Sequence, residues 1–411
     1  MRNITFITML LTALVPSSLF AQTPTNNAAT IDDIRTNYRI HVGPFYVSPT
    51  VLLKEVGVDT NVFNQAGEQK SDFTMTLTPK ADVAVTFARR ALLKATVGSD
   101  VVYYRKYSSE RSFNPLAAVR AEAYAHRLTL FAEGSYLNTR QRPNFEIDLR
   151  SRHREQDVQA GGELRLTPKF SVEVAARRAE ASYDADAQFA GTSLQQTLNR
   201  TTTGLVGTVR HRVTPLTTFA VRFDRLTDTF MFSPVRDSRS FRVMPGVEFK
   251  PRALVSGTAW VGYRRFTPDS PGVLPQFSGL VADLGLSYTL LGSTTFGVSY
   301  HRDLAYSYEV ENPFFVDNSV GASIRRALGG RFDSIVSIDR HVYEYERLLT
   351  APATLFPRAD TTWVYGANLG YRVRRGTRIG FGANYYQRDS STVRLVQYKG
   401  LRYGATVNYG F

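Results

Sequence analysis

LRYGATVNYGF, residues 401–411, decides the fold, because its residues alternate strictly between two chemical kinds up to the end of the chain. Successive side chains of a β-strand point to opposite faces, so the segment predicts a strand with one apolar face. A soluble β-sandwich would show the same alternation. It would not need an aromatic last residue such as Phe411, because the ends of soluble domains are usually polar and poorly ordered. The apolar face comprises Leu401, Tyr403, Ala405, Val407, Tyr409 and Phe411.

This ending resembles the C-terminal signature of bacterial outer-membrane β-barrels, which have phenylalanine last and apolar residues at the alternate positions before it. The resemblance implies that Tyr409 and Phe411 form an assembly signal for the barrel-assembly machinery. We therefore expect an all-β fold, a transmembrane antiparallel up-and-down β-barrel, with a soluble β-protein as the alternative.

The N-terminus has the layout of a secretory signal peptide. Arg2 precedes an apolar run over residues 4–15, and Ala21 supplies a small residue for cleavage. A membrane-spanning helix needs about 18 apolar residues, so this run is too short to be an anchor. We predict a signal peptide (1–21), a periplasmic lead-in (22–44) and a barrel (45–411) in the outer membrane of a Gram-negative bacterium.

The composition narrows the class of protein and its partners. The 411 residues include no cysteine, which excludes a disulfide framework and a lipid anchor on cysteine. No second apolar run is long enough for a transmembrane helix, whereas transmembrane strands give only a weak hydropathy signal. The net charge of +14 favours an anionic partner such as outer-membrane lipid, lipopolysaccharide or an acidic substrate. Export to the outer membrane removes nucleic acid from that set.

Short polar turns alternate with longer polar loops along the chain, which is typical of antiparallel hairpins between two compartments. Turns are expected near residues 89–90, 126–127, 167–169, 212–215, 250–252, 291–293, 328–331 and 373–376. Loops are expected near residues 59–71, 108–115, 141–156, 184–200, 230–238, 267–276, 307–317, 346–361 and 389–397. These connections predict eighteen strands, with sixteen as the alternative, and both termini on the short-turn side.

The two phases of the strands differ in chemistry. Aromatic residues in the apolar phase are expected to form two girdles at the level of the lipid headgroups. In a soluble protein they would be ordinary core residues. They are Tyr103, Tyr263, Tyr288, Tyr300, Trp363, Tyr365, Tyr371, Tyr385 and Tyr409. Arginines at the turns, namely Arg89, Arg90, Arg374 and Arg375, are expected to meet anionic headgroups.

The polar phase is rich in charged residues, and a barrel of eighteen strands is wide enough for an aqueous channel. Ion pairs that brace the wall are expected to account for about half of these charges. Arginines beyond the paired ones would favour anions, especially carboxylates and phosphates. The predicted pore-lining residues are Lys80, Arg165, Arg177, Arg210, Arg222, Arg242, Arg325, Arg372, Arg378, Arg388 and Arg402.

Residues 43–64 (GPFYVSPTVLLKEVGVDTNVFN) and 71–85 (SDFTMTLTPKADVAV) resemble the opening of an outer-membrane β-barrel porin family often encoded among exopolysaccharide export genes. The resemblance implies an outer-membrane location, a role in polysaccharide export, and acidic polysaccharide or other export components as partners. A simpler interpretation of residues 59–63 is a turn at a loop entrance. The matching residues are Pro49, Asp59, Asn61, Val62, Phe63, Ser71, Asp72, Phe73 and Pro79.

Catalysis has little support in the sequence. Ser299 and His301, like Asp339 and His341, are two apart on one strand face, about 7 Å by strand rise and too far for a direct hydrogen bond. No phosphate-binding glycine loop and no metal-ligand spacing appears. We predict no catalytic residues, no metal and no cofactor. The expected function is a channel for anionic solutes or for polysaccharide export. The alternative is a structural or adhesive barrel plugged by loops such as residues 141–156.

Overall fold

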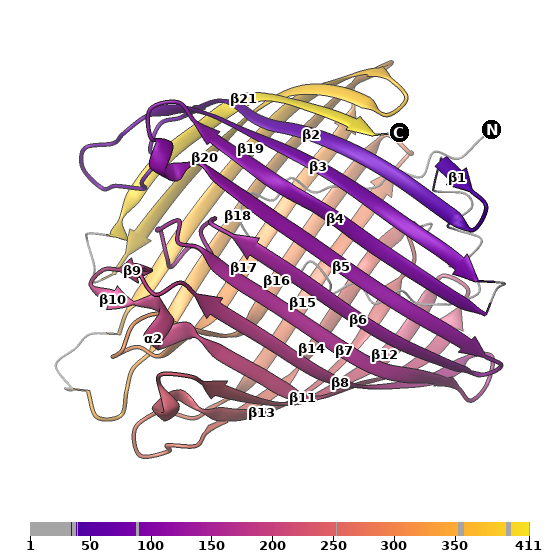
Figure 1. Ribbon diagram of the computed structural model, residues 1–411, viewed down its shortest axis with the longest axis horizontal. Coiled ribbons are helices and arrows are strands. Elements are labelled where there is room, and N and C mark those ends of the chain that lie inside the picture. The colour runs from indigo at the N-terminus through magenta and orange to yellow at the C-terminus, as the bar shows by residue number, and fades with distance from the viewer. Residues whose placement is uncertain are drawn as a thin grey trace.

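The computed structural model describes residues 40–87, 90–251, 253–351, 357–391 and 396–410, together with Ile34 and Tyr38. Eighteen antiparallel strands form one closed wall (Figure 1). They are β2 (Phe45–Asp59), β3 (Asp72–Phe87), β4 (Ala91–Tyr104), β5 (Ser112–Ala125), β6 (Leu128–Thr139), β7 (His153–Arg165), β8 (Phe170–Tyr183), β11 (Arg200–Thr214), β12 (Thr217–Phe230), β13 (Ser238–Phe249), β14 (Val255–Pro268), β15 (Phe277–Leu290), β16 (Thr294–Tyr306), β17 (Phe314–Ala327), β18 (Phe332–Glu346), β19 (Ala359–Arg374), β20 (Thr377–Ser390) and β21 (Tyr398–Gly410).

The first and last wall strands close the barrel. β2 pairs with β21 in antiparallel register, from Thr50 opposite Gly410 to Asp59 opposite Arg402. Every other neighbouring pair in the wall is consecutive in the chain, so the predicted eighteen-stranded up-and-down barrel is confirmed. The predicted signal peptide and the terminal residue Phe411 lie outside the described residues.

Turns and loops alternate as the sequence predicts, with eight short connections at one end of the barrel and nine longer ones at the other. In Figure 1 the short turns lie on the right, at the same end as both termini. The turn between β19 and β20 contains Gly376 at φ +79°, a conformation that residues with a side chain rarely adopt.

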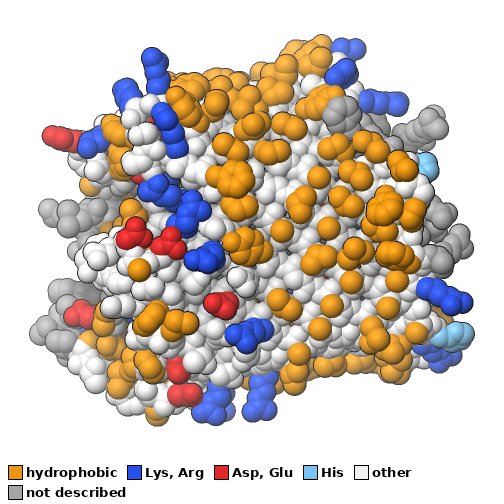
Figure 2. Space-filling view, in the orientation of Figure 1, with side chains coloured by type: hydrophobic (Ala, Val, Ile, Leu, Met, Phe, Trp, Pro, Cys, Tyr) orange, Lys and Arg blue, Asp and Glu red, His pale blue; other side chains and the backbone are white. Residues whose placement is uncertain are grey.

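The two faces of the wall follow the predicted alternation. On β12, Phe219 and Phe223 are 53% and 40% exposed, whereas Ala220 between them is 4% exposed and faces inward. Figure 2 shows hydrophobic side chains covering most of the outer face toward the short turns, with charged side chains at that edge and over the half nearer the long loops. Such an apolar band is the surface that a membrane-spanning barrel presents to lipid.

A β-bulge at Glu55 determines which side chains of β2 face the lumen. Glu55 has φ +58°, and the pairing with both β3 and β21 shifts by one residue around it. This β-bulge directs both Lys54 and Glu55 into the barrel, where Lys54 meets Asp100 at 3.3 Å and Glu55 meets Arg402 at 2.9 Å.

The remaining elements are short. β1 (Ile40–Val42) pairs with the start of β2, and β9 (Gln188–Phe189), β10 (Thr192–Ser193) and α2 (Leu194–Leu198) lie in the loop between β8 and β11. Single 3-10 turns, η1 (Ser108–Glu110) and η2 (Pro234–Arg236), lie in two further loops. Among the described residues, no helix is long and apolar enough to cross a membrane.

Candidate functional site

The basic residues predicted to line the lumen all have inner-face positions, because the strand register puts them out of phase with the exposed apolar side chains. They are Lys80 on β3, Arg165 on β7, Arg177 on β8, Arg210 on β11, Arg222 on β12, Arg242 on β13, Arg325 on β17, Arg372 on β19, Arg378 and Arg388 on β20, and Arg402 on β21.

At least seven of these eleven side chains form ion pairs with carboxylates of described residues. Several of the partners, including Asp157, Asp303 and Asp333, stand at inner-face positions that the alternation did not single out. Charges paired in this way brace the wall and leave less cationic surface for a solute than the sequence suggests. The pairs are Lys80–Asp82, Arg177–Asp157, Arg210–Glu173, Arg242–Asp303, Arg378–Asp333, Arg388–Asp148 and Arg402–Asp59.

The loop of residues 140–152, which joins β6 to β7, folds into the barrel. Its two ends are held by β4, β5 and the turn η1 between them, on the same side of the wall. The backbone amide of Arg140 donates to Asn114 Oδ1 at 2.9 Å, and Arg150 Nη2 donates to the Tyr104 hydroxyl at 2.7 Å. Arg150 also pairs with Glu110 at 3.1 Å. The loop therefore leaves its own side of the wall from two fixed points.

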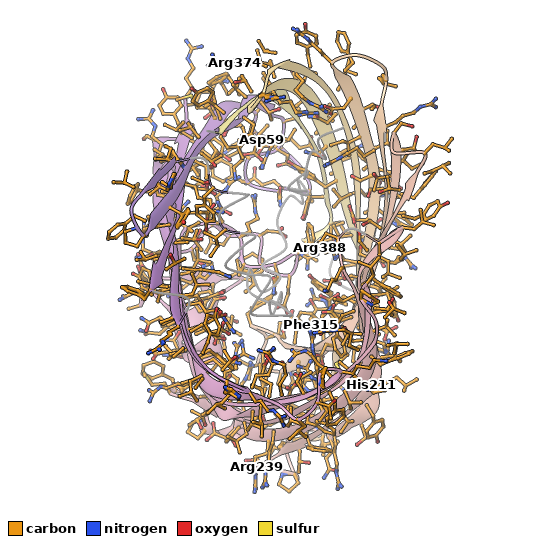
Figure 3. The ribbon with its side chains drawn as sticks, turned by 90° about the vertical axis from the view of Figure 1, so that its right-hand side faces the viewer. Asp59, His211, Arg239, Phe315, Arg374 and Arg388 are labelled. Atoms are coloured by element: carbon orange, nitrogen blue, oxygen red, sulfur yellow. The ribbon has the colours of Figure 1, made fainter. Side chains whose placement is uncertain are left out.

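The middle of this loop reaches the opposite wall, at β17–β20. Phe145 packs in a buried cluster with Phe315, Tyr343, Tyr345 and Val364. Arg388, which is 1% exposed, donates to Asp148 Oδ2 at 2.7 Å and to the Glu146 carbonyl oxygen at 3.0 Å. Figure 3, which views the barrel from the short-turn end, shows Arg388, Phe315 and Asp59 inside the oval wall. Residues 140–152 thus cross the lumen.

Two acidic side chains of the crossing loop are buried. Glu146 is fully buried, and its Oε1 accepts a hydrogen bond from the Ser307 hydroxyl at 2.5 Å. Burial raises its pKa to about 7, and the nearby Glu309 adds to the rise. Burial also raises the pKa of Asp148, although the neighbouring Arg388 and Arg142 oppose that change. The protonation states of Glu146 and Asp148 therefore depend on whether the loop is docked inside the barrel.

Other loops pack against the crossing loop at the long-loop end. Ile147 lies in a buried cluster with Ala187, Leu194, Leu198 and Tyr308, which come from the loops after β8 and β16. Arg236 of η2 ties these loops together by donating to the carbonyl oxygens of Thr197 at 3.2 Å and Ser307 at 2.6 Å. Three further hairpins therefore support the position of residues 140–152.

The loop ends of β16 and β17 also turn into the barrel. β15 and β16 pair only from Ala282 opposite Arg302 to Leu290 opposite Thr294, so the two strands separate at their long-loop ends. Tyr306 stands in the outer phase of β16, yet its hydroxyl donates to Asp228 at 2.8 Å on the inner face of β12. Phe314 likewise packs on the inner-face residue Phe266, with ring centroids 5.2 Å apart. This hairpin narrows the lumen further.

A hollow remains between the crossing loop and the wall strands β2 and β19–β21. Two polar atoms inside it, the Tyr386 hydroxyl and Arg402 Nε, have no hydrogen-bond partner among the described residues. The hollow therefore combines aromatic rings, amides and both signs of charge in a space large enough for about one water molecule. It is lined by Glu55, Asn64, Arg142, Asn144, Phe145, Asp148, Val364, Asn384, Tyr386, Tyr398 and Arg402.

A second group of arginines lies at the short-turn mouth of the lumen. Arg372 on β19 stands directly opposite Arg378 on β20. Arg378 Nε donates to both carboxylate oxygens of Asp333, at 3.1 and 3.0 Å, and the guanidinium lies where a side chain at Gly370 would be. Arg325 on β17 shares this corner and forms no ion pair with any described residue.

The serine and histidine candidates have other neighbours than each other. Ser299 and Asp339 both lie beside Gly321, while His301 lies 3.8 Å from Asp283. His341 Nδ1 is 2.8 Å from the hydroxyl of Ser319, a residue that the sequence gave no reason to select. Within the described part of the chain, no group of three or more acidic or histidine side chains is arranged to bind a metal ion.

Comparison with known proteins agrees with this architecture. Residues 39–411 match the family model described as "Putative beta-barrel porin 2". The chain is similar in structure to a BenF-like porin from Pseudomonas fluorescens Pf-5 (TM-score 0.50, 11% identity, 90% of this chain and 99% of that one). It is also similar to OpdQ (0.49, 9%, 90% and 99%) and to the siderophore receptor PirA (0.44, 8%, 91% and 81%), both from Pseudomonas aeruginosa. At such low identity, these similarities concern the fold alone. Among curated proteins, no sequence matches.

Proposed function

Because the chain belongs to the family described as "Putative beta-barrel porin 2", an outer-membrane β-barrel family, we propose that it forms a constricted channel for small anionic solutes. A cleaved signal peptide over residues 1–21 would export it. The long loops would face outward and the short turns the periplasm, as in other outer-membrane barrels. A solute would then enter from the periplasm past Arg325 and leave past residues 140–152.

The observation that carries the proposal is the arginine corner at the short-turn mouth. Arg325, Arg372 and Arg378 lie on neighbouring strands around one carboxylate, Asp333. Arg325 forms no ion pair with a described residue, and its charge at the short-turn mouth would attract anions from the periplasm. Arginine suits carboxylates and phosphates because its planar fork donates two parallel hydrogen bonds.

The same chemistry extends the proposal to acidic glycans and to a role in polysaccharide export. The hollow beside the crossing loop offers Tyr386 and Tyr398 as ring surfaces and Asn64 and Asn384 as hydrogen-bonding amides. Rings and planar amides are well suited to the faces and hydroxyls of a sugar. The hollow has room for about one water molecule, so an acidic sugar of any length would have to displace residues 140–152 to reach these groups.

A second candidate is a barrel with a plugged lumen and a structural or adhesive role. It is favoured by the crossing of the lumen by residues 140–152, since Arg388 and the Phe145 cluster hold the loop on the opposite wall. The nine outward loops would then carry the structural or adhesive function.

Planar-bilayer recording in asymmetric salt separates the two candidates. The channel proposal predicts conductance with a reversal potential that indicates anion preference. Arg325→Gln should reduce that preference, because it removes an inward-facing charge. Arg326→Gln is the matched control, since Arg326 neighbours it but faces outward. A preference for cations would reject the account of the arginine corner. No conductance, even after residues 141–151 are replaced by a short glycine-serine linker, would favour the plugged barrel.

A further inference from the structure

A hollow lies on the outer, lipid-facing wall between β8 and β13. Its centre is Gly207 on β11, with Val174 of β8 on one side and Phe223 of β12 on the other. The space is about 570 Å³, including the part open to the outside. Its outer-face lining is apolar up to its long-loop edge, where Arg225 stands.

A Cβ atom at the centre of this hollow would make one tight contact, with a backbone carbonyl oxygen. A Cβ atom at position 207 would lie 3.3 Å from the Glu173 carbonyl oxygen and 4.0 Å from the nearest methyl group of Val174. Glycine also weakens a strand interior, because it leaves no side chain to pack. Gly207 therefore avoids that contact and leaves the space beyond it on the outer wall open.

Arginines stand immediately beyond the hollow, toward the long loops. Arg178 on β8, Arg225 on β12 and Arg265 on β14 are exposed, outward-facing, and form no ion pair with a described residue. Arg225 lies in register between Leu205 and Phe241, so it borders the apolar surface directly. Arg239, outside the wall in Figure 3, is by contrast neutralised by Asp269 at 2.8 Å.

We propose that this surface binds one molecule of lipopolysaccharide through its lipid A part. An acyl chain would occupy the hollow over Gly207, and the phosphates of lipid A would accept hydrogen bonds from Arg178, Arg225 and Arg265. An apolar groove topped by arginines without acidic partners is complementary to a lipid with several chains and phosphate groups. Lipid A rather than phospholipid is the occupant, because the arginines lie on the long-loop side, the outer leaflet in such barrels.

Native mass spectrometry of the detergent-purified barrel tests the site, with bisphosphorylated hexa-acyl lipid A as the probe. The wild type should retain one lipid A molecule in preference to phosphatidylglycerol at equal concentration. Arg225→Gln and Arg265→Gln should each weaken retention about fivefold, the factor typical of one basic residue near an anionic lipid surface. Arg326→Gln, an outward arginine at the short-turn end, should leave retention unchanged.

A second pair of variants tests the hollow without changing charge. Gly207→Phe should weaken retention of lipid A by filling the space, and Gly207→Val should have a smaller effect in the same direction. Heat-modifiable migration on gels identifies the variants that fold. Equal retention by the wild type, Arg225→Gln and Gly207→Val, or a preference for phosphatidylglycerol, would overturn the proposal.

Discussion

Arg388 on β20 and Asp148 in the loop between β6 and β7 form a 2.7 Å ion pair that joins opposite sides of the barrel. Arg388 also pairs with Asp360 of β19 at 2.7 Å, so one buried guanidinium links the loop to the wall. Breaking a buried pair by removing one partner is costly, because the other charge is left without compensation. The two carboxylates therefore allow the loop contact to be weakened separately from the wall contact.

Asp148→Asn should loosen the crossing loop and leave the wall intact. Arg388 keeps its pair with Asp360, whereas the loop loses its charged anchor. Single-channel recordings should show larger or more frequently fluctuating conductance than in the wild type, with unchanged heat-modifiable migration. Arg388→Met should in addition lower the free energy of unfolding by about 2 kcal/mol, because the wall loses one charged hydrogen bond to Asp360 while Asp360 keeps its pair with Arg358. Identical recordings for Asp148→Asn and the wild type would show that this pair does not control the loop.

The docked loop should be most stable at acidic pH. The pKa of Glu146 is raised to about 7 when the loop is docked. It returns to about 4.3 when the side chain is in water. Docking therefore favours the protonated form, and this stabilisation, roughly 3–4 kcal/mol, is complete below about pH 4.3 and lost as pH rises to about 7. Conductance should increase across that range.

Glu146→Gln is the control for the pH effect. Glutamine cannot ionise, and its amide can still accept the hydrogen bond from Ser307. Conductance of this variant should stay near the acidic value of the wild type at every pH. A pH dependence equal to that of the wild type would assign the titration to another group.

Deleting Glu55 should be tolerated, whereas deleting Leu52 should not. Glu55 is the extra residue of a β-bulge, so its deletion leaves Lys54 inward and Val56 outward in a regular ladder. Leu52 lies in regular pairing, and its deletion would turn the outward side chains of residues 45–51 into the lumen. Membrane levels and heat-modifiable migration measure the difference. Failure of both deletions to insert would mean that the bulge itself is required for assembly.

The last residues of the chain should control the yield of inserted barrel. Tyr409 is on β21, which closes the wall against β2, and Phe411 follows that strand. Deleting Phe411, or replacing it with Asp, should lower the amount in the outer membrane and increase degradation in the periplasm. Tyr409→Ala is expected to act in the same direction. Normal membrane levels of all three variants would show that the barrel-assembly machinery does not use this ending.

Alternation along the chain was enough to predict the strands, the connections and the inward phase of residues such as Arg210. It could not predict Glu55, because a bulge breaks the two-residue period and depends on both neighbouring strands. The inward position of Tyr306 could not be predicted either. Its side chain stands in the outer phase of β16 and faces inward only where β16 separates from β15. The contact of Phe145 with Phe315 joins segments far apart in the chain, and no local pattern carries that information.

The pairing of β2 with β21 makes the sheet circular, although the chain is linear. Every other strand pairing in the wall joins neighbours along the chain and closes a short loop, whereas this one brings together segments more than 340 residues apart. The loop-closure entropy lost on pairing β2 with β21 grows only with the logarithm of that separation. All of this loss occurs in the one step that closes the barrel. A circularly permuted chain, with its ends joined and a new opening in any outward loop, would keep the same ring of strands. In the permuted chain, a different pair of strands would close the barrel.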